Sequence, residues 1–109
     1  MGDPKPPRTA LSDERLEAAT RSLALLADGT RLRILVALGE GELDVGTLAE
    51  RCGSSTTSTS QHLAKLRAVG LVKTRKQGRF VFYRAGGSHV RTLVREALKH
   101  ADRQLERTR

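Results

Sequence analysis

The sequence predicts a mainly α-helical domain with one small β-hairpin, and three observations lead to this class. Apolar residues recur at helical spacing in five successive segments, polar caps and glycines separate those segments, and residues 71–84 instead alternate around Gln77 and Gly78. The 109 residues suffice for one domain with a modest core. We expect this domain to span residues 11–106, after a disordered arm of residues 1–10 that carries all three prolines.

The first two expected helices are bounded by residues that cap or interrupt a helix. Ser12 is a candidate N-cap, and the helix that follows it reaches about Ala27. The apolar stripe of this helix consists of Leu16, Ala19, Leu23 and Leu26. Either Asp28 or Thr30 can cap the second helix, which Gly39 ends. The core-facing residues expected in the second helix are Leu32, Leu35 and Val36.

A helix, a tight turn and another helix are expected between residues 44 and 70. Asp44 can cap a short helix that ends at Cys52 and Gly53, and its buried residues are Val45, Leu48 and Ala49. The hydroxyl run that follows, residues 54–60 (SSTTSTS), begins the next helix, because Ser54 or Ser55 can cap it. The inward face of that helix carries Leu63, Leu66 and Val69. Two short helices joined in this way form a helix-turn-helix, in which the N-terminal residues of the second helix meet base edges and phosphates.

Residues 71–84 (LVKTRKQGRFVFYR) have the composition of a β-hairpin, with β-branched and aromatic residues on both sides of Gln77 and Gly78. Four basic residues cluster near its tip: Lys73, Arg75, Lys76 and Arg79. A basic hairpin directly after a recognition helix is a wing, which reaches backbone phosphates or the adjacent minor groove. The predicted fold is therefore a winged helix-turn-helix.

The charge distribution also indicates a polyanion-binding face. The formal net charge is +8, and nine of the twelve acids lie in the first 50 residues. From Arg51 to Arg95, both included, there are ten Lys or Arg residues and no Asp or Glu. Such a segment is typical of nucleic-acid binding, and the alternative is a solvated basic surface without a partner.

The last predicted helix carries more apolar surface than a small domain can cover. Its stripe consists of Val90, Leu93, Val94, Ala97, Leu98, Ala101 and Leu105. We expect part of this stripe, together with the first helix, to form a homodimer interface, because two copies are needed to read a two-fold symmetric DNA site. The alternative is that the two terminal helices pack only on each other within one chain.

With these elements in place, the sequence resembles the ArsR/SmtB family of bacterial metal-responsive transcription regulators over roughly residues 20–102. The segments that carry the resemblance are LADGTRLRILVAL, ELDVGTLAERCG, SSTTSTSQHLAKLRAVGLV and the hairpin that ends in VFYR. The resemblance implies a homodimer whose terminal helices form the interface. It also implies that metal binding alters the affinity for operator DNA.

The DNA-contacting positions that the resemblance implies are Thr56, Thr57, Ser60, Gln61, His62 and Lys65. The basic hairpin adds Arg75, Lys76 and Arg79 as expected contacts of the wing. Gln61 is the best candidate for direct readout, because its amide can make two hydrogen bonds to adenine. For His62, a phosphate contact or a local capping role stands beside a base-specific role.

The family's metal sites are only partly preserved. Asp44 and Gly46 stand at the thiol positions of members that sense soft metals, and Cys52 alone cannot build a thiolate cage, which disfavours arsenic, cadmium or lead. In the second type of site, on the last helix, His89 and His100 are present, whereas Gly87 and Arg103 replace the other two ligands. Glu96 and Asp102 are possible auxiliary ligands. Nitrogen and oxygen donors suit nickel, cobalt or zinc, with nickel preferred, and the alternative is a pair of surface histidines that bind no metal.

We therefore expect a DNA-binding transcription regulator controlled by a metal or a partner protein, with no cofactor needed for folding. The alternative is an architectural protein that coats DNA without sequence choice. An enzyme is not expected, because the sequence has no phosphate-binding glycine loop, paired-carboxylate motif or recognisable nucleophile and base. A cytoplasmic location is expected, because no apolar run approaches the roughly 18 to 20 residues that cross a bilayer and the N-terminus has no secretory signal.

Overall fold

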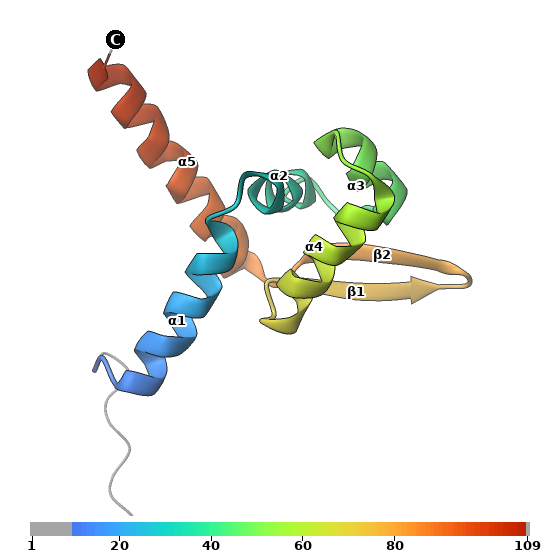
Figure 1. Ribbon diagram of the computed structural model, residues 1–109, viewed down its shortest axis with the longest axis horizontal. Coiled ribbons are helices and arrows are strands. Elements are labelled where there is room, and N and C mark those ends of the chain that lie inside the picture. The colour runs from blue at the N-terminus through green and yellow to red at the C-terminus, as the bar shows by residue number, and fades with distance from the viewer. Residues whose placement is uncertain (1–9, 109) are drawn as a thin grey trace, which may run out of the picture.

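The computed structural model describes residues 10–108, so the predicted arm of residues 1–10 lies outside the described residues except for Ala10. The described chain forms five helices and one two-stranded antiparallel sheet (Figure 1). The elements are α1 (Asp13–Leu26), α2 (Gly29–Leu38), α3 (Val45–Cys52), α4 (Thr56–Ala68), β1 (Val72–Gln77), β2 (Phe80–Ala85) and α5 (Ser88–Thr108). The predicted mainly helical class with a single hairpin is confirmed.

Each of the first four helices begins at a side chain that accepts a hydrogen bond from a backbone amide three residues later. Ser12 accepts from the amide of Arg15 at 3.1 Å, and Asp28 accepts from that of Arg31 at 2.9 Å. Asp44 accepts from the amide of Thr47 at 2.8 Å, and Ser55 accepts from that of Ser58 at 3.0 Å. Of the alternatives that the sequence leaves open, Asp28 rather than Thr30 caps α2, and Ser55 rather than Ser54 caps α4. Gly53, at φ +63°, provides the left-handed residue that ends α3.

The hairpin closes through the two residues Gly78 and Arg79, because Gln77 pairs with Phe80. Gly78 has a φ of +62°, which a two-residue hairpin loop needs at its first position when the loop has a type II′ geometry. The outer edge of β2 is also occupied: the amide of Leu43 donates to the carbonyl of Tyr83 (3.1 Å), and the amide of Tyr83 donates to the carbonyl of Leu43 (2.8 Å). This bridge ties the hairpin to the α2–α3 loop.

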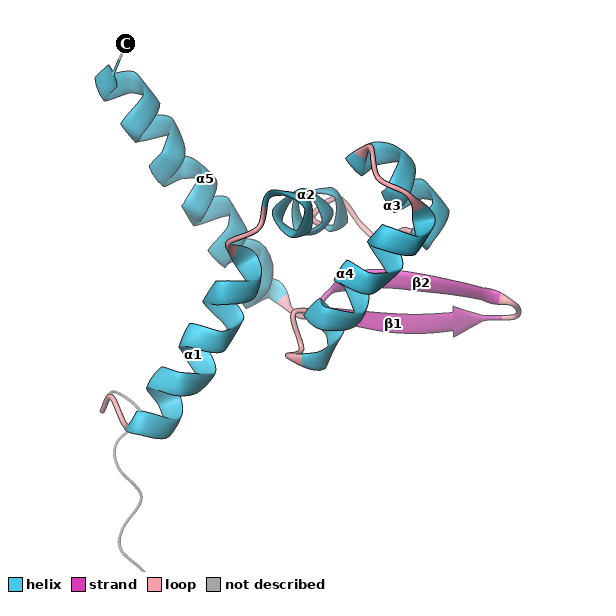
Figure 2. Cartoon of the chain, in the orientation of Figure 1, coloured by secondary structure: helices cyan, strands magenta, loops and turns pink. Residues whose placement is uncertain are grey.

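The core lies where α2, α3, α4, the base of the hairpin and the start of α5 meet (Figure 2). Its most deeply buried apolar side chains are Ile34, Leu38, Leu48, Leu63, Leu66, Val72 and Val90. The expectation for α2 was partly wrong, because Val36 is 43% exposed and Ile34 and Leu38 are buried. Val36 lies about 200° around the helix from Ile34 and therefore on the side away from the core. In α4, Leu63 and Leu66 are buried as expected, and Val69 is half-buried.

The two terminal helices leave the body of the molecule in different directions (Figure 1). None of the residues of α1 is buried, and α5 buries only Val90 and Val94. The main contacts of α1 are with α2, and those of α5 are with α2 and β2, so the two terminal helices do not pack chiefly on each other. Large apolar side chains of both helices, including Leu16, Leu23 and Leu93, are consequently exposed. Among the residues described, no helix is both long enough and apolar enough to span a membrane.

Candidate nucleic-acid interface

The outward face of α4 presents short polar side chains in the helix's first turns. Thr57, Ser60 and Gln61 are exposed and share one face, since they are three and four residues apart. The opposite face carries the buried Leu63 and Leu66, which fix the rotation of α4 about its axis. Thr56 and Lys65 are also exposed and flank the outward face. Five of the six positions predicted on this helix therefore point to solvent.

The hydroxyl run divides between structural and outward roles. Thr59 is completely buried, and its hydroxyl donates to the carbonyl of Ser55 at 2.8 Å. The side chain of Ser55 is itself occupied as the N-cap, as described above. Thr56, Thr57 and Ser60 therefore remain as the exposed hydroxyl residues of the helix.

His62 differs from the other predicted positions on α4, because its ring is turned toward the interior. The residue is half-buried, and its Nδ1 atom is buried without a hydrogen-bond partner in the described structure. His62 lies near Asp28, the N-cap of α2. The pKa of Asp28 is lowered chiefly by the hydrogen bond from the Arg31 backbone amide, and the charges of Arg31 and His62 lower this pKa further. Nδ1 is thus directed away from any DNA that lies on the outward face.

The wing places Lys76 and Arg79 in solvent near its tip. Neither side chain forms an ion pair with an acid in residues 10–108. The wing also contacts the recognition helix, because α4 packs against β1 (Figure 1). The outward face of α4 and the basic hairpin therefore belong to one continuous structural unit that can face a duplex.

Arg75 is committed to contacts within the chain. Its Nε and Nη2 atoms lie 2.9 and 2.8 Å from the same carboxylate oxygen of Glu42, in the α2–α3 loop. Its guanidinium also stacks on the ring of Phe82, with its central carbon 5.1 Å from the ring centroid, and donates to the amide oxygen of Gln77 at 2.9 Å. The hydrogen bond from Arg75 lowers the pKa of Glu42. Arg75 thus holds the hairpin against the body.

Several basic or small residues of this surface were not among the predicted contacts. Ala64 and Arg67 are exposed on the outward face of α4, seven and ten residues after Thr57, so extending the helical spacing would have identified them. The prediction that Lys73 lies near the tip was wrong, because it pairs directly with Arg84 across the hairpin and two cations therefore lie side by side near its base. Glu42 had no sequence signal, because it lies 33 positions from Arg75.

The residues proposed for metal binding do not come together within one chain. The described residues contain no group of three or more His, Cys, Asp or Glu side chains that could hold an ion. His89 and His100 are both exposed on α5 and, being eleven residues apart, are separated by about 16 Å along the helix. Glu96 pairs with Lys99 at 3.2 Å, and Asp102 is exposed. A metal site of this type would need ligands from a second chain.

The position that lacks the family's acidic ligand lies beside the ring of His89. A β-carbon at Gly87 would lie 2.8 Å from two atoms of this exposed ring, so a side chain at position 87 would require the ring to turn. Asp44 stands at one of the thiol positions of the family's soft-metal site, and here it has a structural role as the N-cap of α3. Cys52 is buried, and burial raises the pKa of its thiol.

Comparisons with known proteins agree with this architecture. Residues 28–74 match the family model described as bacterial regulatory protein, arsR family. The transcriptional regulator KmtR of Mycobacterium tuberculosis is 42% identical over 92 residues, which cover 84% of this chain and 71% of that protein. A homologue of the cadmium resistance transcriptional regulatory protein CadC, from Staphylococcus aureus, is 42% identical over 76 residues, 69% of this chain and 63% of that protein.

Among solved structures, this chain is similar to a homodimeric winged helix-turn-helix DNA-binding domain of Mycobacterium bovis, described as a possible ArsR-family transcriptional regulator. The TM-score is 0.81 at 34% identity, and the match covers 91% of this chain and 94% of that one. These relatives are regulators of transcription, which does not favour the architectural alternative. The chain therefore belongs to the ArsR/SmtB family and is a sequence-specific DNA-binding regulator of transcription.

Proposed function

We propose that two copies of this chain bind one operator duplex, with each α4 in the major groove and each hairpin at the adjacent backbone. The observation that carries this proposal is the exposed polar face of α4 beside a hairpin whose tip cations have no acidic partner among the described residues. The geometry is that of a recognition helix followed by a wing.

The exposed side chains divide into those that read bases and those that hold phosphates. Gln61 reads a base edge, because its amide can donate to and accept from adenine, and Thr57 and Ser60 lie on the same face. Lys76 and Arg79 contact phosphates, since they are solvent-facing cations near the tip of the hairpin. Thr56 and Lys65 contact the backbone at the two edges of α4.

Two of the residues expected to bind DNA have different roles in this proposal. Arg75 positions the wing through Glu42, because both of the nitrogens that could clamp a phosphate are already bonded to the carboxylate. His62 reaches DNA only with the ring edge opposite the buried Nδ1. Its main role is to pack α4 against the N-terminus of α2.

The dimer forms through α1 and α5, because these helices bury almost nothing within one chain. Leu16, Leu23 and Leu93 are exposed on them, and isolated helices with such apolar surface gain stability when a second copy covers it. The similar structure from Mycobacterium bovis is homodimeric. A two-fold symmetric dimer presents two recognition helices to a two-fold symmetric operator.

Control by a metal requires both chains of this dimer. His89 of one chain and His100 of the other would supply imidazole nitrogen, with Asp102 or Glu96 as auxiliary oxygen donors, a set that suits nickel, cobalt or zinc. The bound ion would supply a link between the two chains. Control by a partner protein is the alternative. In either case the regulator binds double-stranded DNA in the cytoplasm.

The proposal is tested by selecting binding sites from a random duplex library with the purified protein. We expect enrichment of a two-fold symmetric sequence with half-sites about one helical turn apart, and a specific affinity at least about 1,000-fold above that for random DNA. Enrichment of a single, unrepeated half-site would contradict the dimeric arrangement. Failure to enrich any sequence, with binding that depends only on salt, would restore the architectural alternative.

A further inference from the structure

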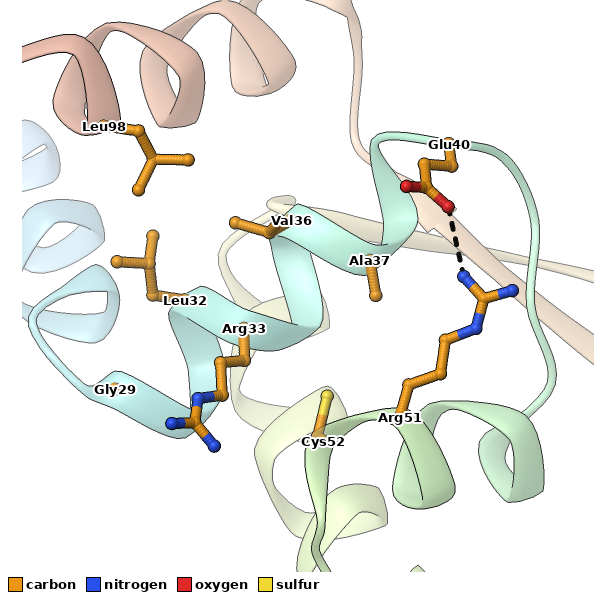
Figure 3. Close-up of a pocket in the computed structure, with 9 residues that line it drawn as sticks. All are labelled: Gly29, Leu32, Arg33, Val36, Ala37, Glu40, Arg51, Cys52 and Leu98. Carbon is orange, nitrogen blue, oxygen red and sulfur yellow. Dashed lines mark hydrogen bonds and ion pairs between the residues drawn. The ribbon is translucent and has the colours of Figure 1, made fainter. Parts of the chain in front are cut away.

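A cavity of about 650 Å³ lies between α2, α3 and the middle of α5 (Figure 3). Its volume is within the range of about 300 to 1,000 Å³ that is typical of small-molecule sites. The residues that line it are Gly29, Leu32, Arg33, Val36, Ala37, Glu40, Arg51, Cys52 and Leu98. It contains neither of the histidines proposed for metal binding and none of the residues assigned to DNA.

The cavity lies on the side of α5 that faces its own chain. Leu98 follows the buried Val90 and Val94 at four-residue steps and points toward α2 (Figure 3). Leu93 is five residues from Leu98 and therefore lies about 140° around the helix. The apolar surface at Leu98 and that at Leu93 thus face different directions, and only the latter belongs to the face proposed for the dimer.

The chemistry of the walls defines the ligand. Leu32, Val36 and Leu98 make one end of the cavity apolar, and the buried thiol of Cys52 points into it from α3 (Figure 3). Arg51 is neutralised by Glu40 at 3.2 Å. Arg33, in contrast, has no acidic partner among the described residues, and its charge acts on the Cys52 thiol by lowering a pKa that burial raises. Arg33 is therefore an exposed cation without an acidic partner among the described residues, at the edge of a largely apolar cavity.

We propose that this cavity binds an organic acid, a carboxylate attached to an apolar body, and that the bound acid regulates the protein. The carboxylate pairs with the guanidinium of Arg33, whose two parallel N–H groups match its two oxygens. The apolar body covers Leu32, Val36 and Leu98. The regulatory part of this inference rests on the proposed dimeric DNA-binding function.

The position of the cavity explains how the acid acts on DNA binding. Leu98 belongs to the proposed dimerisation helix, whereas Arg51 and Cys52 belong to α3, the first helix of the helix-turn-helix. A ligand between them sets the separation of α5 and α3. Because α3 packs against α4, this separation determines how the two recognition helices of a dimer are spaced.

The binding test uses decanoate as the probe and 1-decanol as its neutral match. Cys52 is the only cysteine in the chain, so its rate of alkylation by iodoacetamide, followed by intact mass, reports on the cavity alone. We expect decanoate to slow alkylation saturably and to bind once per chain by calorimetry. We expect decanol to bind at least tenfold more weakly.

Arg33→Gln should weaken the binding of decanoate about tenfold or more, through loss of a charge-assisted hydrogen bond. Arg67→Gln, on exposed α4 surface outside the cavity, is the matched control that should leave decanoate binding unchanged.

A second variant, Ala37→Phe, fills the cavity from α2 and should abolish decanoate binding while circular dichroism shows the fold retained. Equal binding of decanol and decanoate, or unchanged binding to Arg33→Gln, would overturn the proposed ligand chemistry. If Ala37→Phe changed the oligomeric state of the protein and left decanoate binding unchanged, a second copy of the chain would be the true occupant of the cavity.

The regulatory part is measured separately, as the affinity of the dimer for its selected DNA site with and without decanoate. We expect a change of at least fivefold in the wild type and none in Arg33→Gln. Decanoate binding without any change in DNA affinity would overturn the regulatory part. A protein that binds decanoate but shows no sequence-specific DNA binding in the absence of the acid would instead contradict the proposed dimeric function.

Discussion

Replacement of Leu93 by alanine tests whether α5 pairs with a second chain through the side that carries Leu93. Complete burial of a leucine side chain contributes about 1.5 to 3 kcal/mol. Because 40% of Leu93 is exposed in the single chain, covering it in a dimer contributes about 1 kcal/mol per chain and about 2 kcal/mol per dimer. Since each 1.4 kcal/mol is about a tenfold change, Leu93→Ala should raise the dimer dissociation constant about 30-fold.

Leu98 provides a matched control for this experiment, because it is also 40% exposed on the same helix but faces the body of its own chain. Leu98→Ala should therefore change the dissociation constant by less than about threefold. Sedimentation equilibrium measures dimerisation, and thermal unfolding at a fixed chain concentration checks that both variants remain folded. If Leu98→Ala weakened the dimer as much as Leu93→Ala, the assignment of the two faces of α5 would be refuted.

The other predictions concern base readout, the wing, the cap of α4 and the metal ligands. Gln61→Ala should cost about 1 to 3 kcal/mol of operator binding and relax the preference at one base position, and an unchanged preference in site selection would count against base contact. The double change Lys76→Ala and Arg79→Ala should weaken binding to all DNA sequences similarly. It should also reduce the steepness of the slope of log affinity against log salt concentration by about 0.9 for each phosphate that is no longer neutralised. An unaltered slope would show that the wing stays off the DNA. Ser55→Ala should destabilise the protein by about 1 kcal/mol because it removes the α4 cap, measured by urea unfolding, and Ser54→Ala, which removes no cap, should not do so. A mixed dimer in which one chain carries both His89→Ala and His100→Ala should lose strong nickel binding in calorimetry, because every site shared between chains then lacks one histidine; one full-affinity site per mixed dimer would show that the ligands come from a single chain.

Helix boundaries were the part of the fold most accessible from sequence. Ser12, Asp28, Asp44 and Ser55 all act as N-caps in the structure, because a cap depends on one side chain and a backbone amide three residues away. The hairpin was equally accessible, since alternation and the glycine in its loop are both local features.

The rotation of α2 could not be predicted in the same way. Residues 32–38 carry apolar side chains at six of seven positions, so several faces of this helix satisfy the helical period. The contacts with α3, α4 and β2 choose the face that contains Ile34 and Leu38 and leave Val36 exposed. Those contacts join segments that are distant in sequence, and a local pattern contains no information about them.

Parts of the candidate interface were hidden for the same reason. The outward positions Thr57, Ser60 and Gln61 follow from helical spacing alone. The pairing of Arg75 with Glu42 joins the hairpin to the α2–α3 loop, and the inward turn of His62 depends on the packing of α4 near Asp28. A basic residue in the wing therefore cannot be assigned to DNA until the acids of the neighbouring loop have been placed.

The two faces of α5 separate the two kinds of effector that we propose for this chain. His89, Leu93 and His100 lie within about 40° of one another around the helix, so an ion held there would act on the proposed contact between chains. Leu98 lies on the other face, so an organic acid in the cavity would act on the contact between α5 and the helix-turn-helix of the same chain. The first face keeps His89 and His100 of the family's four ligand positions, whereas the second borders the cavity, whose lining includes the Arg33 guanidinium without an acidic partner among the described residues. The nickel and decanoate titrations measure these two proposed kinds of control independently.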